Sequence, residues 1–211
     1  MIKEVIFDLD QTLIDSKDAH LAALIDGLER EGYPTKIEWV YGYTSDNIVR
    51  YNFKDIPEEI LERIVLHKKR VLSNYLKLIK VLPGAVELLK FLRKKKIKIV
   101  LVTNNTHKEI NEIIEEVGLN GYFDNIIGKE DAEPKPSPHP VIKAIRDINF
   151  PLEEIIYIGD SDTDIEAAKA AGIPVMINTQ CHDTAKLKDK TDWVVTNLKE
   201  ALKIIKEMIE E

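Results

Sequence analysis

The order of apolar and polar positions predicts short buried strands that alternate with longer amphipathic helices. Nearly continuous apolar runs, typical of strands buried on both faces, occur at 5–7, 97–102, 123–127, 155–158, 173–177 and 193–195. Between these runs, apolar residues recur every three or four positions, which predicts helices over 83–95, 108–117, 138–147, 162–171 and 198–210. The alternation predicts an α/β fold, a doubly wound parallel sheet with helices on both faces.

Residues 17–82 interrupt this alternation. No buried strand is evident there, and the periodicity instead predicts helices over 19–31, 45–51 and 57–80. We therefore expect a core domain formed by residues 1–16 and 83–211, with a small helical insertion, or cap, formed by residues 17–82. The alternative is a long pair of crossover helices that belongs to the core.

The composition is that of a globular protein. The 211 residues are 44% hydrophobic and carry a formal net charge of −7, which disfavours nucleic-acid and anionic-membrane partners. Acidic residues at Glu4, Asp8 and Asp10 interrupt the N-terminal segment, and no run of about 18 apolar residues occurs, so we expect neither a signal peptide nor a membrane span. The single cysteine, Cys181, cannot form an intramolecular disulfide, which fits a cytoplasmic location. We interpret Cys181, beside His182, as a structural or surface thiol.

The first predicted strand delivers two carboxylates to the carboxyl edge of the sheet, where ligands bind in open α/β folds. Asp8 and Asp10 lie two residues apart in an apolar setting, which is costly unless a cation or a proton relieves their repulsion. The alternative is an acidic turn in which Thr12 or Asp15 caps a helix.

A denser acidic motif follows the strand at 155–158. Asp160, Asp162 and Asp164 fall within five residues, and a helix cap explains one of them but not all three. So many carboxylate oxygens at a buried sheet edge predict a hard cation, with Mg²⁺ as the physiological choice.

Two further segments supply hydrogen-bond donors and a positive charge. Thr103 and Asn104 follow the strand at 97–102 and precede a predicted helix, which suits an anion, although such residues are also ordinary helix caps. Lys135 lies between two prolines, which restrict the backbone and favour a fixed placement of its charge. A surface loop with incidental prolines is the alternative.

Together, the four segments resemble the haloacid dehalogenase superfamily. Its pattern is Asp-x-Asp-x-Thr after the first strand, Thr or Ser after the second, Lys further on, and Gly-Asp-x-x-x-Asp after the fourth. The matching residues are Asp8, Asp10, Thr12, Thr103, Lys135, Gly159, Asp160 and Asp164. The helical insertion falls where one class of the superfamily places its cap. Segments 8–16, 135–138 and 159–161 look most like the phosphoglycolate phosphatase branch, which commonly has Gly where this chain has Gln11.

The resemblance implies a Rossmann-like core and a Mg²⁺-dependent phosphatase that hydrolyses small phosphate monoesters through an aspartyl-phosphate intermediate. Asp8 would be the nucleophile, and Asp10 would protonate the leaving alcohol and later deprotonate water. Asp8, the backbone carbonyl of Asp10 and Asp160 would hold Mg²⁺. The phosphoryl oxygens would be bound by Lys135, Thr103 and the backbone amides of Leu9 and Asn104. Thr12 would support the site, and Asp164 would orient Lys135 or the metal ligands.

Asp10 disfavours a dehalogenase, because dehalogenases of the superfamily carry no aspartate at this position. A phosphosugar mutase and a phosphonate-cleaving enzyme are alternatives, and the full set of catalytic groups disfavours a non-catalytic phosphate-binding protein. The sequence is compatible with a monomer and with a homodimer.

We expect the cap to select the substrate, a small phosphorylated metabolite. The alternative is that the aromatic residues of the cap only form its own core. Candidates for this selection are Trp39, Tyr41, Tyr43, Thr44 and Arg50.

Overall fold

The computed structural model describes residues 1–41, 43–181 and 185–210, so His182 lies outside the described residues. The chain forms two compact units, which are described separately below. Unit 1 comprises Met1–Asp15 and Val81–Glu211, and unit 2 comprises Ser16–Lys80. Within the described ranges, no helix combines the length and the hydrophobicity needed to cross a membrane.

Unit 1 is built on a six-stranded parallel sheet with the strand order β5-β4-β1-β6-β7-β8. The strands are β1 (Glu4–Phe7), β4 (Lys98–Val102), β5 (Asn125–Ile127), β6 (Ile155–Gly159), β7 (Val175–Asn178) and β8 (Trp193–Val195). In the centre, Phe7 of β1 pairs with Leu101 of β4 and with Ile158 of β6. This register brings the loops that follow β1, β4 and β6 to the same edge of the sheet. The predicted doubly wound α/β fold is confirmed.

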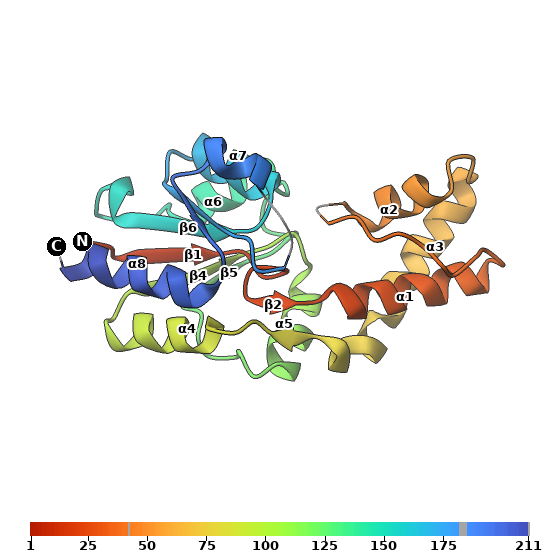
Figure 1. The fold of residues 1–211 in the computed structure, drawn as a ribbon, viewed down its shortest axis with the longest axis horizontal. Coiled ribbons are helices and arrows are strands. Elements are labelled where there is room, and N and C mark those ends of the chain that lie inside the picture. The colour runs from red at the N-terminus through yellow and green to blue at the C-terminus, as the bar shows by residue number, and fades with distance from the viewer. Residues whose placement is uncertain (42, 182–184, 211) are drawn as a thin grey trace. The chain divides into compact units, whose positions relative to one another are not determined.

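Helices cover both faces of this sheet (Figure 1). One face carries α6 (His139–Ala144) and α7 (Asp162–Ala170), and the other carries α4 (Ala85–Lys94), α5 (His107–Glu116) and α8 (Leu198–Glu210). Alternate strand residues point to each layer. Ile6 and Tyr157, for example, belong to one buried cluster with Val141 of α6 and Ile165 of α7.

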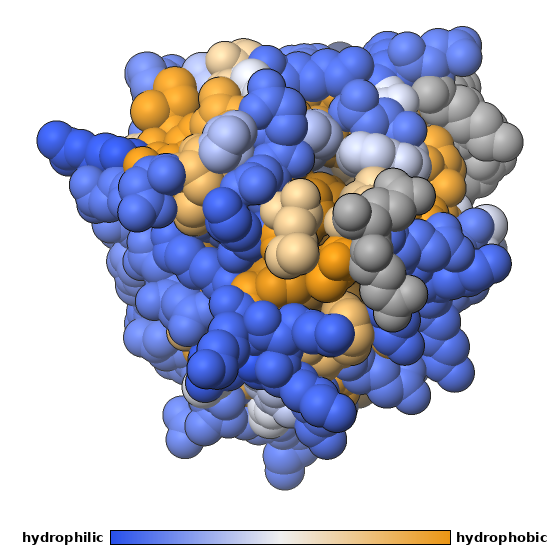
Figure 2. Space-filling model, turned by 90° about the vertical axis from the view of Figure 1, so that its left-hand side faces the viewer, coloured by the Kyte–Doolittle hydropathy of each residue, from blue (hydrophilic) through white to orange (hydrophobic). Residues whose placement is uncertain are grey.

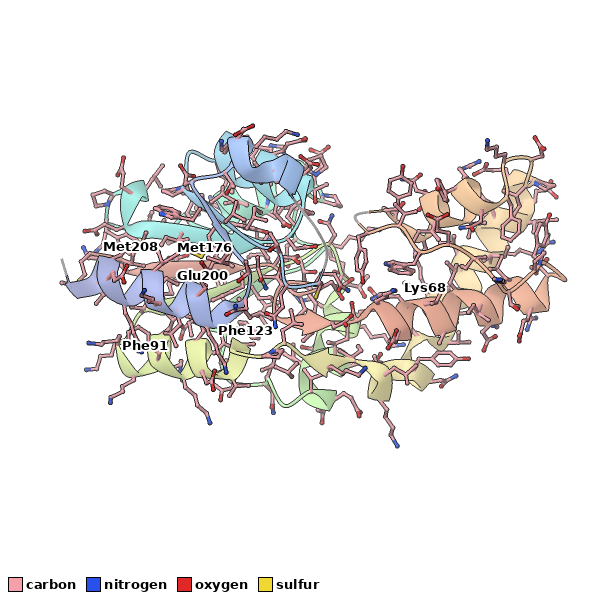
Figure 3. The ribbon with its side chains drawn as sticks, viewed as in Figure 1. Lys68, Phe91, Phe123, Met176, Glu200 and Met208 are labelled. Carbon is pink, nitrogen blue, oxygen red and sulfur yellow. The ribbon has the colours of Figure 1, made fainter. Side chains whose placement is uncertain are left out.

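The opposite layer is joined partly by a cation-π contact. Nζ of Lys206, on α8, lies 5.3 Å from the ring centroid of Phe91, which α4 directs towards α8 (Figure 3). The apolar stem of a lysine can cover a ring in this way while its charged end stays in water.

Some boundaries in unit 1 differ from the predicted ones. β5 begins at Asn125 rather than 123, because Asp124 accepts a side-chain hydrogen bond from the Ile99 N–H at 2.8 Å and ties this segment to β4 before the ladder starts. α6 ends at Ala144 rather than 147, since Asp147 and Asn149 favour turns. The strands β2 (Ile14–Asp15) and β3 (Lys80–Val81), which form a separate two-stranded sheet, are too short to produce a periodic signal.

Unit 2 contains α1 (Lys17–Arg30), α2 (Ser45–Asn52), α3 (Glu58–Val71) and a 3₁₀ segment, Leu72–Leu78. The predicted single helix over 57–80 is therefore wrong, and Ser73 and Asn74, which compete for backbone hydrogen bonds, lie where the α-helix has already ended. Lys68 is buried in this unit and extends from α3, where its Nζ lies 2.7 Å from Nδ1 of His20 of α1 (Figure 3).

A cavity of about 500 Å³ lies where β4 begins, at the opposite end of that strand from Val102. Its lining residues are Arg93, Lys96, Ile97, Lys98 and Asp124. Arg93 pairs with Asp124 at 3.4 Å, and Lys98 pairs with buried Glu4 at 3.1 Å. Figure 2 looks towards the end of unit 1 where the strands begin, and hydrophobic residues there are surrounded by hydrophilic ones. None of the candidate catalytic residues lines this cavity.

Candidate active site

The loop that follows β1 folds back on itself and fixes the backbone around Asp8 and Asp10. The carbonyl of Leu9 accepts hydrogen bonds at 3.4, 2.9 and 3.2 Å from the N–H groups of Thr12, Leu13 and Ile14. Gln11 has a φ of 61°, in the left-handed region. It therefore adopts the conformation for which glycine is the usual residue, and a non-glycine residue there costs about 1–2 kcal/mol.

A buried lysine reaches two of the candidate carboxylates. The Lys135 side chain is only 3% exposed, and its Nζ lies 2.6 Å from Oδ1 of Asp8 and 2.6 Å from Oδ1 of Asp164. The same Nζ lies 2.9 Å from the Tyr157 hydroxyl and 3.2 Å from the Val102 carbonyl oxygen. Groups from four segments of unit 1 thus fix the position of this positive charge.

Asp164 is held by donors on both of its carboxylate oxygens. Its Oδ2 accepts from the N–H groups of Asp160 and Ser161, both at 3.1 Å, and from the Ser161 hydroxyl at 2.6 Å. Its Oδ1 accepts from Lys135 and, at 2.8 Å, from the Tyr157 hydroxyl. Gly159 makes this arrangement possible, because a Cβ there would lie 2.5 Å from Cγ of Asp164. Protein donors therefore engage both oxygens of Asp164.

Burial and charge act in opposite directions on these groups. Burial raises the pKa of Asp8 well above its usual value, and Lys135 offsets only part of this rise. Burial alone would lower the pKa of Lys135, but Asp164 and Asp8 raise it well above its usual value. Burial alone would raise the pKa of Asp164, but Lys135 outweighs burial, and the pKa of Asp164 is lowered. Asp8 is thus the carboxylate whose ionisation calls for more positive charge than the protein itself supplies.

The acidic residues at this edge fit a divalent cation. Asp8, Asp160 and Asp164 are buried, and one carboxylate oxygen from each lies within 4.8 Å of the others. Hard cations such as Mg²⁺ prefer oxygen ligands of this kind. Asp164 already accepts five hydrogen bonds from the described residues, whereas Asp8 accepts two. Asp8 therefore keeps more capacity to bind an ion than Asp164 does, and Asp8 and Asp160 are the side chains that best fit it.

The loop after β4 connects two other parts of the site through asparagine side chains. Asn104 Oδ1 accepts from the Lys135 N–H at 2.8 Å, and its Nδ2 donates to the Lys135 carbonyl at 3.0 Å. The next residue, Asn105, donates from Nδ2 to Oδ2 of Asp10 at 2.5 Å. The sequence offered no sign of these contacts, because Asn104 and Asn105 are ordinary loop residues by type.

The remaining site candidates are Thr12, which was expected to support the site, and the phosphate-binding candidates Thr103, Leu9 and Asn104. Thr12 donates from its hydroxyl to Oδ2 of Asp8 at 3.3 Å, and Thr103 is 4% exposed at the end of β4. The backbone N–H groups of Leu9 and Asn104 donate to no other residue in the described part of the chain. The predicted site residues of unit 1 therefore cluster at one sheet edge, although Asp10 contacts this cluster through Asn105 rather than through Lys135.

Other residues noted in the sequence lie elsewhere or have another role. In unit 2, Trp39 packs against the apolar cluster of the helices, which agrees with the alternative that the cap aromatics form the core of the cap. Arg50 forms an ion pair with Glu58. The ring of Tyr41 lies 5.4 Å from Nζ of Lys17. Burial raises the pKa of Cys181 to about 12, so its thiol is a poor nucleophile at neutral pH.

Known proteins are similar to this chain in sequence and in fold. A family model for haloacid dehalogenase-like hydrolases matches residues 5–178. The phosphoglycolate phosphatase of Aquifex aeolicus is 32% identical over 181 residues, covering 81% of this chain and 82% of that protein. Pyrophosphatase PpaX of Halalkalibacterium halodurans is 29% identical over 183 residues, covering 83% of each chain.

A solved structure supports the fold independently. The crystal structure of a predicted phosphoglycolate phosphatase from Haemophilus somnus has a TM-score of 0.85 at 23% identity, covering 97% of this chain and 98% of that one. With most of the sequence matched by the family model and the core fold shared, this chain is an enzyme that belongs to the haloacid dehalogenase-like hydrolases.

Proposed function

We propose that this protein is a Mg²⁺-dependent phosphatase that hydrolyses small phosphate monoesters through an aspartyl-phosphate on Asp8. The observation that carries the proposal is the buried pair of Asp8 and Lys135, with a separation of 2.6 Å, next to the carboxylate of Asp160. A carboxylate held beside a fixed positive charge suits attack on a phosphoryl group, because phosphoryl transfer is catalysed mainly by positioning and charge stabilisation. The two curated relatives named above are a phosphoglycolate phosphatase and a pyrophosphatase, in line with this chemistry.

In the first step, a carboxylate oxygen of Asp8 attacks the phosphorus atom of the ester. The phosphoryl oxygens are bound by Lys135, Thr103 and the N–H groups of Leu9 and Asn104, which donate to no other residue in the described ranges. Asp10 gives its proton to the leaving oxygen as the bond between phosphorus and that oxygen breaks.

In the second step, water attacks the phosphorus atom of the aspartyl-phosphate. Asp10, now ionised, takes the proton from this water, and the carboxylate of Asp8 is restored as inorganic phosphate leaves. Asp164 keeps Lys135 in place through both steps, because its pair with Nζ is buried and does not involve the substrate.

The ion that fits this site is Mg²⁺, with Asp8, Asp160 and the backbone carbonyl of Asp10 as its protein ligands. When bound, it supplies positive charge that offsets the repulsion between a phosphate dianion and the carboxylates. The raised pKa of Asp8 supports this assignment, since a cation nearby favours the ionised nucleophile.

Incubation of the protein with p-nitrophenyl phosphate and Mg²⁺ is expected to release inorganic phosphate. Removal of divalent metal with EDTA is expected to lower the rate by about 100-fold or more, because the ion contributes several kcal/mol of charge stabilisation. Added Mg²⁺ should restore the rate, and circular dichroism should report the same fold with and without EDTA. Absence of phosphate release, or release that EDTA leaves unchanged, would contradict the proposal.

We infer that the substrates are small phosphorylated metabolites, and that unit 2 contributes to the choice among them. The relatives differ in this respect, since one is named for phosphoglycolate and another for pyrophosphate. Comparison of kcat/KM across phosphoglycolate, pyrophosphate and sugar phosphates identifies the preferred class.

A further inference from the structure

We propose that Asn105 is a positioning residue, which fixes the carboxyl group of Asp10 and determines which of its oxygens carries the proton given to the leaving group. The proposal rests on the proposed function and adds a residue to it. Its basis is the hydrogen bond from Asn105 Nδ2 to Asp10 Oδ2 at 2.5 Å, between groups 95 residues apart in the sequence.

The backbone of Asp10 is already held by its own loop. Asp10 forms an isolated parallel bridge with Ile14, and the Gln11 N–H donates to the Ile14 carbonyl at 2.6 Å. The carboxyl group, however, extends from this backbone through two rotatable bonds. A fixed backbone therefore leaves its direction open, and the contact with Asn105 restricts that direction.

Asn105 is itself held by its surroundings, so its side chain can act as a fixed reference. Its carbonyl accepts from the Lys129 N–H at 2.9 Å, and its N–H donates to the Thr103 hydroxyl at 3.3 Å. A Cβ on Gly128 would lie 3.1 Å from the Asn105 carbonyl oxygen, which shows how closely the loops after β4 and β5 approach.

Asp131 strengthens this junction between the two loops. Its Oδ2 accepts from the Gly128 N–H at 2.9 Å and lies 2.5 Å from Nε2 of His107, at the start of α5. Lys143 reaches Oδ1 of the same carboxylate at 2.9 Å. The segment that carries Asn105 is thus fixed at both of its ends.

The chemical nature of the amide decides where the proton of Asp10 lies. An amide nitrogen donates hydrogen bonds and accepts none, so Oδ2 of Asp10 must act as the acceptor. A proton on Oδ2 would weaken this bond, which favours Oδ1 as the protonated oxygen. Asp10 Oδ1 then gives its proton to the leaving oxygen, which keeps the electron pair of the broken bond to phosphorus. In the hydrolytic step the same Oδ1 takes one proton from the attacking water.

The experiment compares two esters that differ in their need for an acid. Nitrophenolate leaves readily as an anion, whereas the alkoxide of ethyl phosphate or phosphoglycolate needs a proton. In Asn105→Leu, which keeps the approximate size but removes the amide, kcat/KM for the alkyl ester is expected to fall at least about tenfold more than kcat/KM for p-nitrophenyl phosphate. We compare kcat/KM because it reports formation of the aspartyl-phosphate, whereas kcat also includes the hydrolytic step that both esters share. Inhibition by inorganic phosphate should stay close to its wild-type value.

Matched variants separate this role from a structural one. Asn111→Leu makes the same change at an exposed position of α5 and is expected to alter neither kcat nor the ratio between the esters. Asn105→Ala serves as a second test if the leucine variant folds poorly, and the same selective loss is expected. Equal losses of kcat/KM for both esters, or no loss in any Asn105 variant that folds, would overturn the proposal. If the wild-type protein releases no phosphate from either ester, the proposed function itself fails instead.

Discussion

Replacement of Asp8 by Asn is expected to lower kcat for p-nitrophenyl phosphate by on the order of 10⁴-fold or more, as loss of a nucleophile does in other enzymes that use one. The substitution keeps the size of the side chain but removes the oxygen that attacks phosphorus. We expect the fold to persist, because burial already disfavours charge at this position and an amide can still accept from Lys135. Steady-state kinetics and thermal unfolding of the same preparation provide the measurement.

A matched control is available at the start of α7. Asp162 carries an exposed carboxylate, which pairs with Lys190 at 2.9 Å rather than with any group of the site. Asp162→Asn makes the same chemical change and should keep kcat within about threefold of the wild-type value, since exposed ion pairs contribute little. Comparable losses in both variants would show that any lost carboxylate in this region impairs turnover, and so would contradict the nucleophilic role of Asp8.

Replacement of Lys135 by Met is expected to impair both activity and stability. The fixed positive charge on the phosphoryl oxygens would be lost, which should lower kcat by on the order of 10²- to 10³-fold. Without metal, Asp8 and Asp164 would be left as buried carboxylates without their cation, a change that typically costs about 3–5 kcal/mol. Lys129→Met, at an exposed position six residues earlier, is the control and should change neither quantity much.

The stability of the Lys135→Met variant should also depend on pH in a defined direction. Loss of Lys135 removes a group that lowers the pKa of both carboxyls. The folded-state pKa of Asp8 therefore rises further above the unfolded value, and that of Asp164 rises from its lowered value. A raised pKa gives a stabilisation that is complete below the unfolded pKa and is lost as the pH rises through the folded pKa. In EDTA, the loss of unfolding free energy relative to wild type should therefore grow from about pH 5 to about pH 8. A loss of unfolding free energy that is independent of pH would mean that Asp8 and Asp164 do not cause the destabilisation of the Lys135→Met variant.

Much of the fold could be predicted from the sequence, because long apolar runs and helical periodicity leave few alternatives. Val5 to Phe7 and Ile155 to Ile158 contain almost no polar residue, and both are buried strands of the sheet. The break of the helix after Val71 could not be predicted in this way, since the apolar spacing continues beyond it. Local competition for backbone hydrogen bonds, rather than periodicity, decided that boundary.

For the candidate site, the sequence could predict residue types and their edge of the sheet but not their partners. Parallel strands end together, so Asp8 and Asp160 could be expected to lie close to each other. Tyr157 reads as one more apolar strand residue, yet its hydroxyl contacts both Lys135 and Asp164. Asn105 likewise reads as a loop residue, and only the folded chain shows that it reaches Asp10. Such contacts depend on the exact approach of loops that are far apart in the sequence.

The most direct test of the account is chemical identification of the phosphorylated residue. The Asp10→Asn variant, in which hydrolysis of the intermediate should be slow, would be mixed with Mg²⁺ and p-nitrophenyl phosphate, whose leaving group needs no acid. The sample would then be quenched in acid and reduced with borohydride, which converts an acyl phosphate of aspartate into homoserine. Peptide mass spectrometry should then find homoserine at position 8, and none in a sample without substrate. Turnover without homoserine at position 8, or homoserine at another aspartate, would contradict the central claim that Asp8 is the nucleophile.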